Sequence, residues 1–293
     1  MRFTRRIIFS VLIALIQILA LFQVKPVYAA GEIILNNLGT SYTQDFNTLD
    51  TTISSVLPTG WYLFETGTNA NTTYRAGTGT LNTGDTYSFG AAASSERAFG
   101  TLQSGTLIPT IGAKFINDTG ASIQSLQIAY DGEQWRRGTS LERSDALRFQ
   151  ISLDANGLNN GNWISYPDLD FSSQITTGVS GALDGNATAN RLEISHTITG
   201  LCIPNNASFW VRWEDENATS SDDGLAIDNF SLTPLSEPAA IAITTLGTGY
   251  QQDFNTLAFE GQSSCLPGGW HFFESGTSGS VDGLYTAGTG SSN

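Results

Sequence analysis

A stretch near the start of this chain returns near its end. Residues 33–49 recur as residues 241–257, 208 positions further on, and 11 of the 17 residues are identical. The similarity continues with small insertions, so that Leu57-Pro58-Thr59-Gly60-Trp61 returns as Leu266-Pro267-Gly268-Gly269-Trp270. Self-similarity of this kind indicates tandem copies of one structural unit. The repeat therefore indicates that one domain of this chain is about 208 residues long.

The repeat divides the chain into one whole copy and the beginning of another. We expect a domain over residues 31–235, a short linker over residues 236–240 and an incomplete second copy over residues 241–293. A fragment of a β-domain leaves strand edges unpaired. We therefore expect the protein to continue beyond residue 293.

Residues 1–29 have the features of a secretory signal peptide. Three arginines precede an apolar run from Ile7 to Phe22, and the small residues Ala29 and Ala30 offer a cleavage site. The alternative is a membrane anchor, but the run is shorter than the roughly 20 residues that an anchor needs. We therefore expect a secreted protein, extracellular or on a cell surface, with no transmembrane segment after cleavage.

The net charge excludes one class of partner. It is −14 for the whole sequence, and it becomes −18 without residues 1–29, which hold four of the 13 basic residues and no acidic one. A negative surface repels phosphate backbones, so we expect no nucleic-acid partner. Only 14% of the residues are charged, so Thr, Ser, Asn and Gly must supply most of the polar surface. Such a composition favours strands and turns.

Alternating apolar and polar residues predict strands in the first copy. A period of two is present in segments 122–130, 146–153, 191–198, 208–213 and 225–232. Clusters of Asn, Asp and Gly separate these segments, and none of them carries a helical stripe. We therefore predict an all-β fold, an antiparallel two-sheet β-sandwich of the jelly-roll type.

Acidic residues near both ends of the first copy point to a calcium site. Two aspartates stand in the loop before segment 225–232 and a third lies inside it, while an Asp and an Asn lie close to the other terminus. The first and last strands of a sandwich are often neighbours, and Ca²⁺ prefers oxygen ligands. The candidate ligands are Asp45, Asn47, Asp222, Asp223 and Asp228. The alternative is that these are ordinary turn and surface residues.

Glu133, Trp135 and Arg136 form a polar-aromatic cluster. An aromatic ring beside an arginine and a carboxylate can stack on a sugar ring and bond to its hydroxyls, so these residues are candidate ligand-binding residues. The alternative, which we favour, is a structural loop in which Arg136 pairs with Glu133 and Trp135 covers a sheet edge.

No set of residues singles out a catalytic centre. His196, the only histidine of the first copy, lies on the apolar side of a predicted strand, and no serine lies in a nucleophile elbow. No spacing marks a carboxylate pair for glycoside hydrolysis. We therefore expect the residues present to be non-catalytic. Cys202 and Cys265 lie in different copies, where an inter-domain disulfide and two free thiols both remain open.

Three segments together resemble one group of bacterial modules: residues 44–47 (QDFN), residues 57–61 (LPTGW) and residues 223–232 (DGLAIDNFSL). They resemble the cleaved-adhesin and MAM-like group of jelly-roll modules in secreted proteins, which precede Ig-like repeats or nuclease and phosphatase modules. The resemblance covers residues 33–234 and part of 241–293. It implies structural calcium, with Asp45 and Asp228 as the best metal candidates, and a role in adhesion or substrate targeting. Asn229 stands where the group commonly has a second aspartate.

These observations predict a secreted, non-catalytic module that binds an extracellular glycan, the matrix or a cell-surface component. The alternative is an accessory N-terminal region of a secreted hydrolase of the nuclease or phosphatase type, with its catalytic domain beyond residue 293. A third possibility, that the domain is itself a glycosidase, requires a cleft with two carboxyl groups about 5–10 Å apart.

Overall fold

The computed structural model describes residues 31–236 without interruption. It also describes residues 241, 243, 245–255, 257–259, 261–276 and 281–290. The predicted signal peptide and all but the first residue of the predicted linker lie outside the described residues. Within the described part, no helix is long and apolar enough to cross a membrane.

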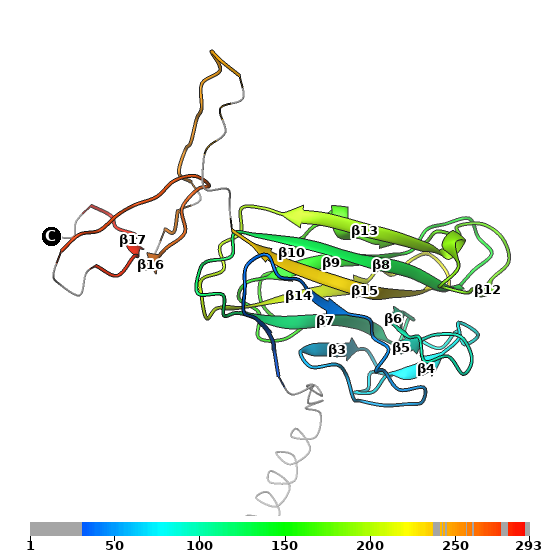
Figure 1. The fold of residues 1–293 in the computed structure, drawn as a ribbon. Helices are drawn as coiled ribbons and strands as arrows, with labels where there is room; N and C mark the ends of the chain where they lie inside the picture. Colours follow the sequence, from blue (N-terminus) through cyan, green and yellow to red (C-terminus); the bar gives the residue numbers. More distant parts are fainter. Residues whose placement is uncertain are drawn as a thin grey trace, which may run out of the picture.

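The first of two facing sheets has the strand order β1-β7-β14-β9-β10, with β3 also paired to β7 and β11 to β9 (Figure 1). The pairs are antiparallel except for β1 and β7, which run parallel. The strands of this sheet are β1 (Ile33–Leu35), β3 (Trp61–Thr66), β7 (Ile108–Asn117), β9 (Ala146–Ser152), β10 (Ile164–Ser165), β11 (Phe171–Ser172) and β14 (Ser208–Asp215).

The second sheet has the order β12-β8-β15-β6-β5-β4, with β13 also paired to β8 and β2 to β15. Its strands are β2 (Tyr42–Gln44), β4 (Arg75–Gly77), β5 (Asp85–Phe89), β6 (Ala98–Leu102), β8 (Ser125–Arg137), β12 (Gly181–Ala182), β13 (Arg191–Ile198) and β15 (Gly224–Leu235). Two short 3₁₀ turns, Pro167–Leu169 and Thr188–Asn190, are the helical elements of the described chain. The predicted all-β sandwich is confirmed.

Aromatic side chains fill the space between the sheets. Trp61 of β3 stacks with Trp213 of β14 at 6.1 Å between ring centroids. Phe230 of β15 meets Trp213 edge-on at 5.7 Å between ring centroids. All three are fully buried. Each aromatic ring of this size removes a large apolar area from water, which is the dominant favourable term in folding. The sandwich therefore has a core that joins both sheets.

The alternation that predicted the strands describes the core faces well, with three exceptions. Leu192, on the same face of β13 as the buried Ile194, is 44% exposed. Leu147, Phe149 and Ile151 of β9 are buried as expected, but Leu153 is exposed because β9 ends at Ser152. His196 of β13 is half-buried rather than packed in the core, and its Nδ1 lies 3.6 Å from a carboxylate oxygen of Asp168. Leu153 lies just past the end of β9, and His196 lies on β13, which pairs with β8 alone.

The described part of the second copy repeats local contacts of the first. Phe254 and Trp270 pack edge-on with centroids 4.7 Å apart, as Phe46 and Trp61 do at 4.6 Å. In both copies the tryptophan N–H donates to a tyrosine hydroxyl at 3.0 Å. A short hairpin of β16 (Gln262–Ser263) and β17 (Tyr285–Thr286) stands where the first copy has a bridge between residues 54 and 74. The repeated sequence thus produces repeated geometry.

Replacing Trp213 by alanine tests the central position of this ring. We expect Trp213→Ala to lower the free energy of unfolding by about 3–5 kcal/mol, because it removes the contacts to both sheets and leaves a cavity. Ile34→Ala, at the exposed position of β1, serves as control and should cost less than about 1 kcal/mol. Urea unfolding of the mature chain measures both, and equal losses would contradict a core centred on Trp213.

Candidate functional site

The pairing of β15 with β8 brings acidic residues together on one face of the second sheet. In this ladder Asp228 lies opposite Asp131, and Ala226 lies opposite Glu133. Side chains alternate along a strand, so Asp131, Glu133 and Asp228 share a face. Ile227, between Ala226 and Asp228, packs into the main core. The acidic residues therefore lie on the outer face of the sheet.

Three carboxylates on this face form what we call the carboxylate trio: Glu96, Glu133 and Asp228. Their ligand atoms lie within 4.8 Å of one another. Glu133 is 0% and Asp228 4% exposed. One oxygen of each, Glu96 Oε1, Glu133 Oε1 and Asp228 Oδ1, is buried without a hydrogen-bond partner among the described residues. Buried carboxylate oxygens without donors are costly, and the trio is therefore a candidate site for a cation.

The described residues supply some hydrogen-bond donors to the trio, but none of their arginines or lysines forms a salt bridge with it. The indole N–H of Trp135 donates to Glu133 Oε2 at 2.9 Å. The Asn186 amide donates to Glu96 Oε2. Arg191, the nearest arginine by sequence pairing, forms its salt bridge with Asp131 instead. The trio thus keeps three oxygens free and an excess of negative charge.

Burial changes the protonation of two members of the trio. Burial, with added repulsion from the Asp228 carboxylate, raises the pKa of Glu133 to about 8. Burial likewise raises the pKa of Asp228 to about 7, with added repulsion from Glu96 and Asp131. Without a cation, these groups hold protons at neutral pH. A divalent cation would replace those protons, which is the behaviour expected of a metal site.

Unusual backbone geometry surrounds the trio. Asn229, which follows Asp228, has a φ of +47°, and Phe46 has a φ of +56°. Residues other than glycine rarely adopt such left-handed values, and they gather at functional sites when neighbouring structure holds them. At Asn229 the β8–β15 register also shifts. This bulge turns the chain immediately after a trio residue.

The structure places the predicted ligands Asp45 and Asn47 beside the trio. Strand β2 pairs with β15, so the first and last parts of the sandwich are neighbours, as expected. Both side chains are exposed, and Asn47 Oδ1 accepts a hydrogen bond from the backbone N–H of Arg97 at 2.9 Å, next to Glu96. Asp45 and Asn229 line a hollow of about 480 Å³ at the surface. Asp45 and Asn47 therefore border the trio without belonging to it.

The other two predicted ligands, Asp222 and Asp223, lie apart from the trio. Five residues of extended chain separate Asp223 from Asp228, which is roughly 16 Å. Four donors bond to Asp223 at 2.6–3.1 Å, so both of its oxygens are satisfied by protein. They are Gln134 Nε2, Gly138 N, Arg143 Nη2 and Ser173 Oγ. Asp222 accepts a bond from the backbone N–H of Ala218 at 2.8 Å. The five predicted ligands therefore do not converge.

Asp223 belongs to a second buried polar cluster at this end of the sandwich. Asp145 Oδ2 accepts a hydrogen bond from the backbone N–H of Asp223 at 2.7 Å. Burial raises the pKa of Asp145 to about 7. Burial also raises the pKa of Asp215 well above its ordinary value, and the charge of Asp145 adds to the effect. These carboxyl groups act as neutral or bonded parts of the interior.

Trp135 is buried, contrary to its proposed use as a sugar platform. It is 1% exposed, lies on strand β8 rather than in a loop, and stacks on Phe89 with centroids 6.0 Å apart. Gly185 crosses its indole so closely that a Cβ there would lie 2.3 Å from the ring nitrogen. A ring covered in this way has no face left for a ligand. Its indole instead orients Glu133.

Arg136 does not pair with Glu133 either. Its guanidinium donates to the backbone carbonyls of Gly79 and Thr80 at 2.9 and 3.2 Å. It therefore holds a loop against the end of β8. Among the predicted ligand-binding residues, the structure leaves Glu133 alone in a position to bind something, and the candidate ligand is a cation.

One aromatic residue that the sequence did not single out is partly exposed. Five of the six tryptophans lie in the first copy, and four of these are buried, whereas Trp163 is half-exposed. The Arg212 guanidinium lies 4.1 Å from the centroid of the Trp163 ring. Gln150 accepts a hydrogen bond from Arg212 Nε at 2.7 Å on the same side of the first sheet. An aromatic ring beside guanidinium and amide groups is the combination that sugars contact.

No protein-family model matches the chain, and no curated protein sequence does. Solved structures with similar folds, among them the following three, are found at low identity. The xylan-binding CBM22-1 domain from Paenibacillus barcinonensis Xyn10C is 10% identical, with a TM-score of 0.35, and covers 69% of this chain and 98% of that one. The K3 cleaved adhesin domain of Lys-gingipain from Porphyromonas gingivalis is 11% identical, with a TM-score of 0.37, and covers 60% and 93%.

The third is the enzymatically active domain of bacteriophage CBA120 tailspike protein 4. It is 13% identical, with a TM-score of 0.33, over 60% of this chain. The chain spans only 19% of the length of that tailspike protein. The structural neighbours thus include carbohydrate-binding modules and an adhesin domain. At these values the likeness does not place the chain in any of their families.

The raised pKa values predict how stability depends on pH when chelator is present. Between about pH 4 and pH 8 the folded protein binds more protons than the unfolded chain, because the pKa values of Glu133, Asp228 and Asp145 are raised only in the folded state. Stability should therefore fall as the pH rises from 5 to 8. Chemical unfolding at several pH values in EDTA measures this, with Glu133→Gln expected to flatten the slope. Stability that rises over this range would contradict the burial of these acids.

Proposed function

We propose that this chain is a secreted, non-catalytic β-sandwich module that binds an extracellular glycan or cell-surface component, and that a calcium ion held by the carboxylate trio completes its fold. One observation carries the calcium part of the proposal: three carboxylates within 4.8 Å, each with a buried oxygen that lacks a partner among the described residues.

Calcium suits this donor set better than other common ions. Carboxylate oxygens are hard ligands, and Ca²⁺ accepts six to eight of them in flexible geometry, with water and carbonyl groups filling the remaining positions. Neither histidine nor cysteine contributes to the trio, as zinc sites usually require. The ion would join the loop before β6 to β8 and β15. It would supply charge neutralisation and a cross-link between segments far apart in the sequence.

The same geometry supports a non-catalytic role. Glycosidases hold two carboxyl groups on either side of the scissile bond, about 5 Å apart or more, with the sugar between them. The trio lies closer together, and Glu133 and Asp228 are covered by protein. A sugar cannot enter between them. We therefore assign the trio to structure and the ligand to another face.

For that face we propose the outer surface of the first sheet around Trp163. Of the tryptophans in the first copy, Trp163 is the one that is not buried, although part of its ring packs against a cluster that includes Tyr62 and Trp210. Arg212 fixes one side of the ring, and the hydrogen bond from Trp163 Nε1 to the carbonyl of Asn160 at 2.8 Å holds its edge. A ring held in this way loses little entropy when a sugar stacks on it.

Calcium should raise the melting temperature of the mature protein. At 1 mM calcium a site of about 10 μM affinity adds roughly 2.7 kcal/mol, or about 5–10 °C for a domain of this size. Glu133→Gln and Asp228→Asn should each abolish most of the shift, because each removes a charged ligand. Glu193→Gln, an exposed acid on β13, is the matched control and should retain it. An unchanged melting temperature in calcium and in EDTA would refute the site.

A glycan array tests the binding face. Trp163→Ala should weaken binding to any glycan that the wild type retains by about fivefold or more, since a stacked aromatic ring commonly contributes over 1 kcal/mol. Trp163→Phe keeps a ring and should lose less. Circular dichroism checks that both variants are folded. Equal binding by the alanine variant and the wild type would move the site elsewhere.

A further inference from the structure

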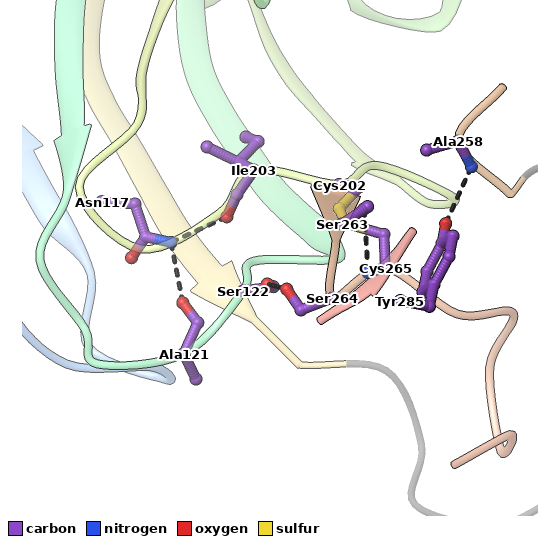
Figure 2. The surroundings of a disulfide bond; sticks show 10 residues. All are labelled: Asn117, Ala121, Ser122, Cys202, Ile203, Ala258, Ser263, Ser264, Cys265 and Tyr285. Carbon is purple, nitrogen blue, oxygen red and sulfur yellow. Dashed lines mark hydrogen bonds between the residues drawn. A yellow bond between two sulfur atoms is a disulfide. The ribbon is translucent and has the colours of Figure 1, made fainter. Parts of the chain in front are cut away.

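The two cysteines of the chain form a disulfide that joins the first copy to the second. Cys202 lies in the loop between β13 and β14, Cys265 lies in the second copy just after β16, and their Cα atoms are 5.9 Å apart (Figure 2). This separation is typical of disulfides. The hydroxyls of Ser122 and Ser264 also lie within hydrogen-bond distance, at 2.9 Å. The short sheet of β16 and β17 lies beyond the end of the sandwich at which β15 finishes (Figure 1).

Cys202 is held on a firmly attached loop. On one side of it, the backbone N–H of Leu201 donates to the carbonyl of Gln124 at 2.9 Å. On the other side, Ile203 and Ile123 exchange two backbone hydrogen bonds of 2.9 and 3.0 Å. The side chain of Asn117 donates to the carbonyl of Ile203 at 2.8 Å (Figure 2). Backbone hydrogen bonds thus hold the loop against residues 123–124, which directly precede β8. The sandwich therefore sets the position of the Cys202 sulfur.

Cys265 occupies an outward-facing position of the repeated unit. It stands at the place of Val56 in the first copy, and Val56 is 69% exposed. The local structure is the same in both: the backbone N–H of Val56 donates to Ser54 Oγ, and that of Cys265 donates to Ser263 Oγ, each at 3.1 Å. A cysteine at this position can therefore reach a neighbouring domain without disturbing its own interior.

The difference between the two copies has a physical reason. The side chain of Val56 is exposed to solvent, whereas the equivalent residue 265 faces the end of the first copy. We propose that the end of the sandwich formed by residues 119–124 and 199–205 is a docking surface for the next copy of the same unit, and that the Cys202–Cys265 disulfide fixes the two copies in one orientation.

Chemistry and space at the contact agree with a joint that needs a covalent link. Residues of both copies line hollows of about 320 and 800 Å³ beside the disulfide, so the surfaces are not tightly packed there.

Oxidation of the two thiols releases two electrons and two protons. A disulfide carrier of an oxidising compartment accepts them and becomes a dithiol, as in ordinary thiol–disulfide exchange. The bond closes a segment 63 residues long in sequence.

Fixed copies would have a consequence for binding. This consequence rests on the function proposed above, although the joint itself does not. If each copy carries a glycan-binding face, a rigid joint sets the spacing between the faces. Avidity is greatest when that spacing matches the spacing of the sites on the ligand.

Small-angle scattering of the mature protein tests the joint. We expect the oxidised wild type to contain no alkylatable thiol under denaturing conditions and to scatter as a single conformation. The Cys202→Ser/Cys265→Ser double variant should show a larger radius of gyration, and its amides over residues 262–267 should exchange with solvent about tenfold faster or more. Val56→Ser, at the equivalent exposed position of the first copy, is the matched control and should scatter as the wild type does.

Two results would overturn the proposal. One is a pair of free thiols in protein purified without reductant. The other is a double variant whose scattering and hydrogen exchange superimpose on those of the wild type, which would show that the disulfide does not set the orientation. Neither result bears on calcium or glycan binding, so failure of the joint and failure of the proposed function remain distinguishable.

Discussion

The pairing of β15 with β8 places two carboxylates, Glu133 and Asp228, on one covered face of a sheet. Like charges this close repel strongly where the dielectric constant is low. Glu96 adds a third carboxylate from the loop before β6. Burial raises the pKa values of Glu133 and Asp228 to about 8 and about 7, so protons neutralise these two groups up to about neutral pH. The proposed calcium ion would take the place of those protons.

The inner and outer faces of the second sheet therefore have different roles. The inner face joins the aromatic core around Trp213, which is mostly apolar and in which the indole N–H of Trp61 donates to the Tyr42 hydroxyl. The outer face carries a smaller cluster in which Trp135 stacks on Phe89 and turns its N–H toward Glu133. Sequences usually avoid such buried acids, and those that retain them do so for a function. With the proposed calcium ion bound, the acids would connect segments that are distant in the sequence.

How much of this was predictable varies from residue to residue. The strands around Phe149 and Trp213 followed from alternation, because a half-buried strand repeats every two residues. Asp228 was found because it interrupts an apolar strand near the end of the domain. Glu96 was missed because it lies in a loop, and only the order β8-β15-β6 brings it to Glu133. That order depends on long-range pairing, which no local pattern reports.

The failures have a similar cause. Asp222 and Asp223 were grouped with Asp228 because they are close in sequence, yet an extended strand separates them by many ångströms. The ring of Trp135 was a candidate platform because of its polar neighbours, but loops from elsewhere in the chain cover it. Trp163 carries no distinguishing motif, and its exposure emerges only once the other tryptophans are buried.

Terbium luminescence offers the most direct measurement of the trio. Tb³⁺ is a hard ion that occupies calcium sites built from oxygen ligands, and its green emission is sensitised by a nearby indole. Trp135 donates a hydrogen bond to Glu133, so an ion bound at the trio lies next to a sensitiser. Excitation of tryptophan should then give terbium emission that calcium displaces and that Glu133→Gln removes. Emission that is absent, or that is unchanged in this variant, would contradict a cation site at the trio.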